Sequence, residues 1–274
     1  KLKVVEEDLG EVGRDYFDVG PREKLFDTPA AIARVARSTA YAKTMVVSAE
    51  ESFDANGRPL AWTWRVLCGD PDAIEIAPLN PAGSVARLRI PWHERHGVAP
   101  GAALECNRVD IGVFAHNGIH FSAPAFVSIH HLDSETRVYD GEKRILSAEY
   151  RSRAAGGNYA DPALHTPADW RDEYDYDGEG RLRGWTRIRG DSRESFTADG
   201  ALVTKKDGAG RPIETRTVRY TSAPTGAGTA PRLDYAPGGE VRTRERDAGA
   251  FAPADPERIR RENAMRRRAP ARPR

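Results

Sequence analysis

Four stretches of the chain share a short pattern in which an Asp is followed four residues later by an Arg. The copies begin at Asp54, Asp140, Asp177 and Asp207, and Lys143 stands in the second copy where the others have Gly. Asp and Gly favour turns, because the Asp side chain bonds the local backbone and Gly accepts a left-handed conformation. Each copy precedes an alternating apolar stretch. The pattern therefore predicts hairpin turns that lead into strands, and an all-β fold.

The overall composition fits a soluble globular protein. Of the 274 residues, 39% are apolar and 30% are charged, and the length allows one large or two smaller β domains. No apolar run approaches the roughly 18 residues of a membrane span, so we expect none. The chain opens with Lys1 and has no signal-peptide pattern, which indicates a mature, trimmed or excised piece.

Positive charge is concentrated at the C-terminus. Residues 257–274 carry eight Arg and two Glu, whereas the first 256 residues carry a net charge of −5. A folded part that is mildly acidic does not favour a nucleic-acid surface. Residues 223–274 are rich in Pro, Gly and Arg with few apolar anchors. This composition predicts a disordered basic tail.

Residues 1–38 are weakly patterned, and we interpret them as a leading arm. Thr28 is a candidate helix cap, and Pro29 follows at the first helical position. These two residues predict a short helix over residues 30–37.

Residues 39–132 have the pattern of a β-sandwich. Residues 60–68 alternate, with Trp62 and Trp64 on the same face, and residues 109–115 and 121–129 flank an Asn-Gly turn. Pro124 lacks the amide that a central ladder needs, which predicts an edge strand or a bulge there. Six or seven short strands within about 90 residues are typical of a sandwich.

Part of this stretch resembles the polycystic-kidney-disease (PKD) type of immunoglobulin-like domain. Residues 52–57 match the Asp-rich turn of that family, and Trp62 and Trp64 hold the places of its aromatic-x-Trp strand. Residues 69–71 come two positions later than the family's Gly-Asp-Gly and lack its second Gly. The resemblance implies a sandwich that serves as a spacer or adhesion module, generally outside the cytoplasm.

Residues 133–222 place an aromatic ring shortly before Asp-Gly three times, at Tyr139, Tyr176 and Phe196. These units resemble the tyrosine-aspartate (YD) repeats of bacterial wall-associated and Rhs-type proteins. The spacing between Asp140, Asp177, Asp199 and Asp207 is 37, 22 and 8 residues, so one constant period is absent. We therefore expect a short antiparallel hairpin meander packed on the sandwich.

Six of the seven histidines lie between His93 and His131. His93 and His96 would reach one metal ion if they shared a helix, but Pro91 and Gly97 mark a loop, and no third ligand follows the zinc motifs. The sequence therefore predicts no metal site there. A metal-dependent enzyme that uses this histidine cluster is retained as an alternative hypothesis.

The turn at Asn117-Gly118 decides how two further histidines are placed. A two-residue turn pairs His116 with Ile119 and sends His120 to the opposite face, whereas a three-residue loop pairs His116 with His120. Asn-Gly favours the two-residue turn. We keep His116 and His120 as candidate ligand-binding residues.

The cysteines and acidic turns indicate no cofactor. Cys68 and Cys106 are too few for a zinc cluster, and we interpret them as buried thiols, with a single disulfide bridge as the alternative. Calcium is the alternative at four oxygen-bearing turn residues, although such residues occupy turns for backbone reasons alone. These residues are Asp54, Asn56, Asp70 and Asp72.

Arg183, Trp185 and Arg187 share one face of an alternating strand. Trp185 is then either a solvent-side platform for a sugar ring or a ring covered by the arginine stems, and we favour the covered ring. We identify no catalytic residue.

These observations lead to one main hypothesis and one alternative besides the metal-dependent enzyme. We expect a non-catalytic module of a larger exported bacterial protein, located extracellularly or in the cell envelope. It would act as a spacer, adhesion or ligand-presenting element beside neighbouring domains. The alternative is an accessory carbohydrate-binding module of a hydrolase, with glycans or cell-wall components as partners.

Overall fold

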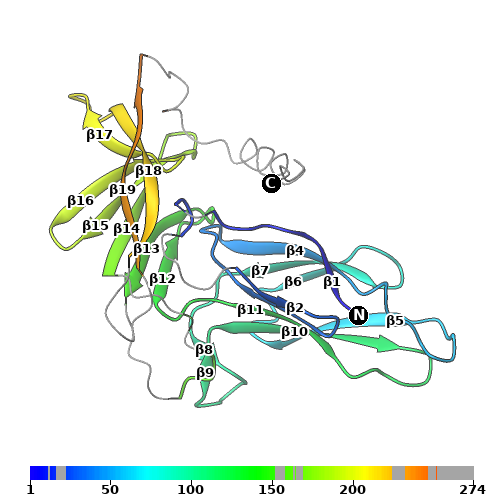
Figure 1. The fold of residues 1–274 in the computed structure, drawn as a ribbon. Coiled ribbons are helices and arrows are strands. Elements are labelled where there is room, and N and C mark those ends of the chain that lie inside the picture. The colour runs from blue at the N-terminus through cyan, green and yellow to red at the C-terminus, as the bar shows by residue number, and fades with distance from the viewer. Residues whose placement is uncertain are drawn as a thin grey trace.

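The structure is a computed structural model that describes residues 1–11, 13–16, 23–151, 158–162, 164, 169–223, 232–245 and 251. Every regular element in this part of the chain is a β-strand, which confirms the all-β prediction. The strands form two bodies, a sandwich that contains the N-terminus and a meander beside one of its ends (Figure 1).

The sandwich has a four-stranded and a five-stranded sheet. The four-stranded sheet has the order β1 (Lys3–Glu7), β4 (Ala42–Ser48), β7 (Val85–Pro91), β6 (Glu75–Pro78). The five-stranded sheet has the order β2 (Lys24–Asp27), β3 (Ala31–Val35), β11 (Ala125–His130), β10 (Arg108–His116), β5 (Ala61–Cys68). Neighbouring strands are antiparallel except β3 and β11, which are parallel.

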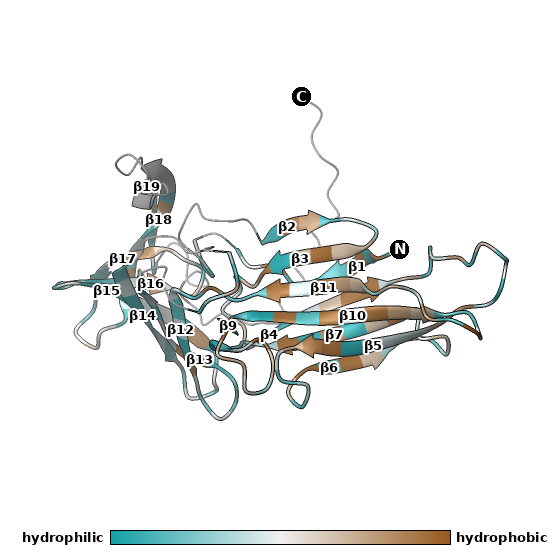
Figure 2. Ribbon diagram, turned by 90° about the horizontal axis from the view of Figure 1, so that it is seen from below, coloured by the Kyte–Doolittle hydropathy of each residue, from teal (hydrophilic) through white to brown (hydrophobic). Residues whose placement is uncertain are grey.

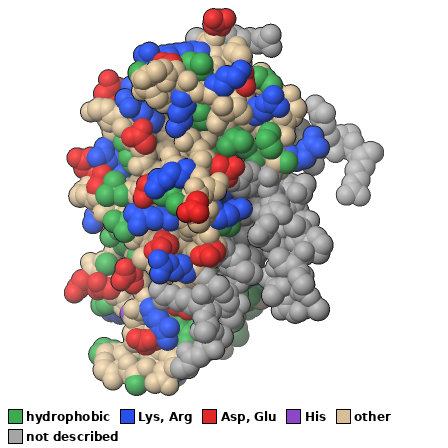
Figure 3. All heavy atoms as spheres, turned by 90° about the vertical axis from the view of Figure 1, so that its left-hand side faces the viewer, with side chains coloured by type: hydrophobic (Ala, Val, Ile, Leu, Met, Phe, Trp, Pro, Cys, Tyr) green, Lys and Arg blue, Asp and Glu red, His purple; other side chains and the backbone are tan. Residues whose placement is uncertain are grey.

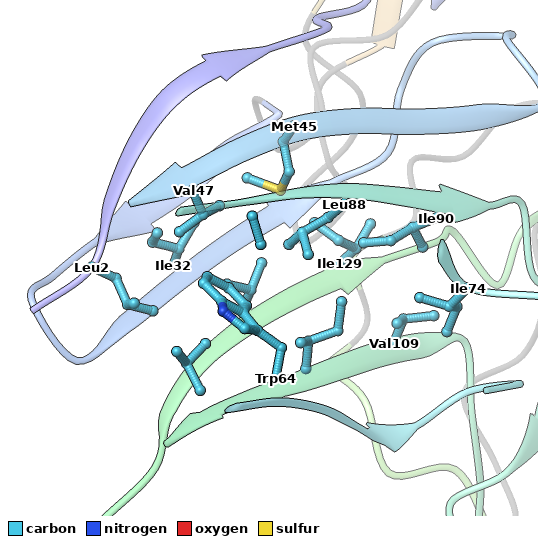
Figure 4. Close-up of a cluster of buried hydrophobic side chains, with 14 of the residues drawn as sticks. Leu2, Ile32, Met45, Val47, Trp64, Ile74, Leu88, Ile90, Val109 and Ile129 are labelled. Carbon is cyan, nitrogen blue, oxygen red and sulfur yellow. The ribbon is translucent and has the colours of Figure 1, made fainter. Parts of the chain in front are cut away.

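Branched aliphatic side chains from both sheets fill the space between them (Figure 4). Val47, Leu88 and Ile111 are fully buried, and Trp64 joins them while its indole Nε1 donates to the Gly83 carbonyl at 2.7 Å. Trp62 packs against the same cluster, as the alternation of residues 60–68 predicts. Figure 2 shows the apolar segments concentrated in the strands of the sandwich.

The predicted helix over residues 30–37 is wrong, because this segment forms β3. The Thr28 hydroxyl accepts the Ala31 amide hydrogen at 2.9 Å, which closes the turn between β2 and β3 instead of capping a helix. Ile32 and Val35 are then buried in the five-stranded sheet. The interpretation of residues 1–38 as a leading arm is also wrong, since β1, β2 and β3 from this stretch are part of the sandwich.

The expectation for Pro124 is also wrong. β11 begins directly after this proline, at Ala125, so the missing amide lies outside the ladder. The strand is central, between β3 and β10, and its register with both neighbours is regular.

The meander is a single antiparallel sheet of eight strands in chain order, as the sequence predicts for residues 133–222. It also extends further, because β19 pairs with β18 where the sequence predicted a disordered tail. Residues 224–231, 246–250 and 252–274 of that tail lie outside the described residues. The strands are β12 (Glu135–Tyr139), β13 (Ile145–Arg151), β14 (Asp169–Tyr176), β15 (Leu182–Arg189), β16 (Ser192–Thr197), β17 (Leu202–Lys206), β18 (Pro212–Ala223) and β19 (Arg232–Thr243).

Three hairpins of the meander use the recurrent turn in the same way. In each, one oxygen of the Asp side chain accepts the amides two and four residues later, while the other accepts Nε of the Arg. Gly180 and Gly210 both have φ of +77°, and Lys143 has φ of +63° at the equivalent position. The copy that contains Lys143 therefore forms the same turn, with a left-handed backbone that glycine would adopt at a lower cost in free energy.

The buried face of the meander holds a charged pair among aromatic rings. Arg187 and Asp172 are fully buried, and their atoms form two parallel bonds, Nε to Oδ1 at 2.9 Å and Nη2 to Oδ2 at 2.7 Å. The guanidinium carbon of Arg187 lies 4.6 Å from the ring centroid of Trp170 and 5.4 Å from that of Phe196.

On the molecular surface shown in Figure 3, basic and acidic side chains are interspersed.

β12 attaches the meander to the sandwich. Arg137 Nη1 donates to the Ser38 carbonyl at 2.5 Å, and the Tyr139 hydroxyl donates to the Thr39 carbonyl at 3.3 Å. The Tyr139 ring also meets Tyr41 edge to face, with centroids 5.1 Å apart. Side chains of the meander thus bond to backbone carbonyls of the sandwich.

Candidate metal centre

Two cysteines and one histidine converge at the end of the sandwich that faces the meander (Figure 1). Cys68 is the last residue of β5. His96 begins β8 (His96–Gly97) and Cys106 ends β9 (Glu105–Cys106). Because β8 and β9 pair with His96 opposite Cys106, the hairpin between them brings these two side chains together and presents both to Cys68.

The separations between the three donor atoms are those of a tetrahedral metal site. The sulfur atoms of Cys68 and Cys106 are 3.4 Å apart, and Nε2 of His96 lies 3.7 Å from each. Zinc bonds of about 2.3 Å to sulfur and about 2.0 Å to nitrogen imply sulfur–sulfur edges of about 3.8 Å and sulfur–nitrogen edges of about 3.6 Å. One ion would therefore reach all three atoms after shifts of a few tenths of an ångström.

The His96 ring is oriented as a metal ligand needs. Its Nδ1 lies 3.0 Å from the carbonyl oxygen of Glu94 and donates a hydrogen bond to it. The proton is then on Nδ1, and the lone pair of Nε2 points toward the two sulfur atoms. A backbone acceptor on the far nitrogen is the usual device that fixes the tautomer of a ligating histidine.

The two thiols are buried, and burial affects the ionisation of Cys68. Cys106 is fully buried and Cys68 is 8% exposed. Burial, together with the neighbouring Cys106 thiol, raises the pKa of Cys68 to about 12. Cys68 is therefore a neutral thiol at pH 7 unless a cation lies beside it, and a coordinated divalent ion deprotonates such a thiol.

His93, the other member of the predicted histidine pair, does not join this group. Its Nδ1 donates to the Pro91 carbonyl at 2.7 Å, and its Nε2 accepts the Asp70 amide hydrogen at 3.3 Å. Its ring stacks on His131 with centroids 5.8 Å apart. The sequence missed the site because the two cysteines are 38 residues apart, and the only local signal was the histidine pair, of which one member takes part.

Both expected arrangements of His116 and His120 are wrong. His116 bridges to Phe121, so the loop contains four residues, Asn117 to His120. The Asn117 side-chain oxygen accepts the amide hydrogens of Ile119 and His120, which closes the wider loop. The two imidazoles are therefore not cross-strand partners, and they lie at the opposite end of the sandwich from Cys68.

The face predicted to hold Arg183, Trp185 and Arg187 is interrupted between the first two residues. The register of β14 and β15 shifts there, because Asp175 pairs with Gly184 and Tyr176 pairs with Leu182. Arg183 is the extra residue of this bulge and is exposed, while Arg187 is buried against Asp172. Trp185 is 2% exposed and stacks on Phe196, so its ring does not lie at the surface.

The four residues considered for calcium form two separate groups. Asp54 and Asn56 precede β5 and Asp70 and Asp72 follow it, so the eight-residue strand of about 26 Å separates them. The Asp54 carboxylate accepts the amides of Asn56 and Arg58, and the Asp70 carboxylate accepts the amide of Asp72. Both carboxylates thus bond their own turns.

The described residues define a class: an all-β protein in which a sandwich with a two-cysteine, one-histidine candidate metal centre is joined to a hairpin meander. The chain matches no protein-family model, no curated protein and no solved structure. Within the described part, no helix is long and apolar enough to cross a membrane.

Proposed function

We propose that this chain is a zinc-binding β module that acts as a non-catalytic spacer or ligand-presenting part of a larger exported bacterial protein. The observation that carries the zinc proposal is the convergence of Cys68, His96 and Cys106 at tetrahedral spacing. Two thiolates and an imidazole are ligands that favour zinc over the harder magnesium and calcium ions.

The location of the three ligands supports a structural role for the ion. They come from the end of β5 and from two strands of only two residues each, which have few backbone bonds of their own. An ion bound by all three would connect this short hairpin to the five-stranded sheet. The described residues supply three ligands, so one position of a tetrahedral site is left for a further ligand.

Metal analysis of matched variants tests the zinc proposal. We expect one zinc per chain in the wild type, and a tetrahedral thiolate spectrum when cobalt replaces zinc. Cys106→Ser and His96→Gln should each abolish stoichiometric binding. His93→Gln is the matched control, because His93 is three residues from His96 but bonds to Pro91 and Asp70 instead. The absence of bound metal in the wild type would refute the proposal, as would equal loss in both histidine variants.

A disulfide between the same cysteines is a second candidate, favoured by the 3.4 Å separation of their sulfur atoms. Oxidising compartments form such bridges, and a bridge would remove both thiolate ligands. The raised pKa of Cys68 opposes it, because thiolates and not thiols react. Alkylation of the unfolded, unreduced protein followed by intact mass distinguishes the two: the zinc module adds two alkyl groups, and the disulfide form adds none.

The spacer proposal rests on the PKD and YD resemblances, and the bonds from Arg137 and Tyr139 to the sandwich are consistent with it. The carbohydrate-binding alternative required an accessible Trp185, whose ring is buried. We therefore expect no retention on immobilised glycans by the wild type. Retention that Trp185→Ala abolishes would favour the carbohydrate-binding module instead.

A further inference from the structure

A short segment from the meander packs beside the candidate metal centre. Residues 158–162, called the strap here, belong to the connection between β13 and β14. The Glu105 amide donates to the Asn158 carbonyl at 2.7 Å, and the Ala160 amide donates to the Glu105 carbonyl at 2.8 Å. The strap thus lies parallel to β9, with Tyr159 opposite Glu105.

Side chains of the strap bond to Asn107 and Arg108, the two residues that follow Cys106. The Asp161 carboxylate, whose side chain is 2% exposed, accepts the Asn107 amide at 2.9 Å and Arg108 Nη1 at 2.7 Å. The Tyr159 hydroxyl donates to the Asn107 side-chain oxygen at 2.9 Å. The strap therefore holds the chain on both sides of a metal ligand.

We propose that metal binding at Cys68, His96 and Cys106 orders the strap, so that occupancy of the site controls how firmly residues 158–162 are held against residues 105–108. This inference rests on the proposed zinc function. The metal and the strap both order the segment around Cys106, whose own strand has two residues. Because the metal and the strap order the same segment, binding of one favours binding of the other, and the coupling free energy is the same in both directions.

Hydrogen exchange on the full chain tests the coupling, because three amides report on the strap directly. They are the amides of Glu105, Asn107 and Ala160. We expect them to exchange at least tenfold faster after zinc is removed with a chelator, while the amides of β15 and β16 keep their rates. Equal protection of the three amides in zinc-loaded and zinc-free protein would overturn the inference while leaving the zinc proposal intact.

Variants of the strap test the same coupling in the reverse direction, through their effect on zinc affinity. Asp161→Asn replaces one of the two accepting oxygens with an NH2 group, so either the Asn107 amide or Arg108 Nη1 loses its acceptor. We expect it to weaken zinc binding about tenfold without changing the one-to-one stoichiometry. Tyr159→Phe removes a single bond and should weaken it less. Asp175→Asn, an exposed carboxylate of the meander, is the matched control. Unchanged zinc affinity in both strap variants would refute the coupling, and a wild type that binds no zinc would refute both proposals.

Discussion

The sandwich and the meander exclude water from their interiors with different side chains. The core of the sandwich contains sixteen buried residues in the described part, and Trp64 is the only aromatic one. The buried cluster of the meander contains six, of which four are aromatic, and it adjoins the ion pair of Arg187 and Asp172. Two facing sheets need only branched aliphatic chains to fill the space between them, whereas the single sheet of the meander covers a charged pair with broad rings.

Because of this difference, we expect substitutions to destabilise the sandwich and the meander for different reasons. In the sandwich, a truncated side chain leaves a cavity, and the loss scales with the missing volume. In the meander, a truncated partner leaves a buried charge, and the loss is set by desolvation.

The largest effect is expected from Arg187→Met. It leaves the Asp172 carboxylate buried without its bidentate partner, and we expect a loss of about 3–5 kcal/mol in the free energy of unfolding. Adding Asp172→Leu should recover most of this loss, because the charge that needed compensation is then gone. Urea unfolding of the two single variants and the double variant measures the cycle. Additive losses would show that the pair contributes through packing alone.

A cavity variant in the sandwich comes next. Leu88 is fully buried between the sheets, and Leu88→Ala should cost about 3 kcal/mol. Leu67 is 48% exposed on β5, and Leu67→Ala, the matched control, should cost less than about 0.5 kcal/mol. Thermal or urea unfolding measures both. Similar losses in the two variants would contradict a close-packed aliphatic core.

Acid should affect the sandwich more than the meander, because all six histidines in the described residues lie in the sandwich. Burial, reinforced by the nearby His93 and Arg137, lowers the pKa of His131 well below its ordinary value of 6.5. The unfolded chain binds a proton that the folded one does not, so the stabilisation is complete above about pH 6.5 and is lost as pH falls toward the lowered pKa.

His131→Phe measures this contribution. The titratable groups that act on His131 are the stacked His93, Arg137, His130 and His96, and the cavity beside it is also lined by Asp8, Glu23 and Lys43. The variant removes one titrating group and should reduce the loss of stability between pH 6.5 and 5 by up to about 2 kcal/mol, since one proton contributes at most about 1.4 kcal/mol for each pH unit. An unchanged slope in unfolding experiments across that range would show that His131 is not the group responsible.

The smallest effect is expected at the recurrent turn. Lys143→Gly should stabilise the chain by about 0.5 kcal/mol, because it relieves the left-handed backbone but removes the ammonium that lies 4.6 Å from the Tyr41 ring centroid. Gly210→Lys is the matched reversal, with φ of +77° and open space around its Cβ position, and should cost about 1 kcal/mol. Equal signs for the two substitutions would contradict the shared turn geometry.

The sequence was sufficient where the determinant is local. The alternation of residues 60–68 and the Asp-to-Arg turns predict strands and hairpins because each signal lies within one element. The segment after Thr28 was misassigned because its side chain closes a β-turn as readily as it caps a helix, and burial of Ile32 against distant strands decides between them. The candidate metal centre was missed for the same reason, since only the fold joins Cys68 to His96 and Cys106.

The parallel pairing of β3 with β11 determines the order in which the chain can fold. Residues 31–35 find their partners at residues 126–130, nearly a hundred positions later, whereas each strand of the meander adjoins the one before it in the chain. Contacts of large sequence separation slow folding, and segments that await them remain exposed. During synthesis, Ile32 and Val35 therefore cannot be buried by pairing of β3 with β11 until residue 130 has left the ribosome. The meander, in contrast, adds one hairpin at a time as its strands emerge.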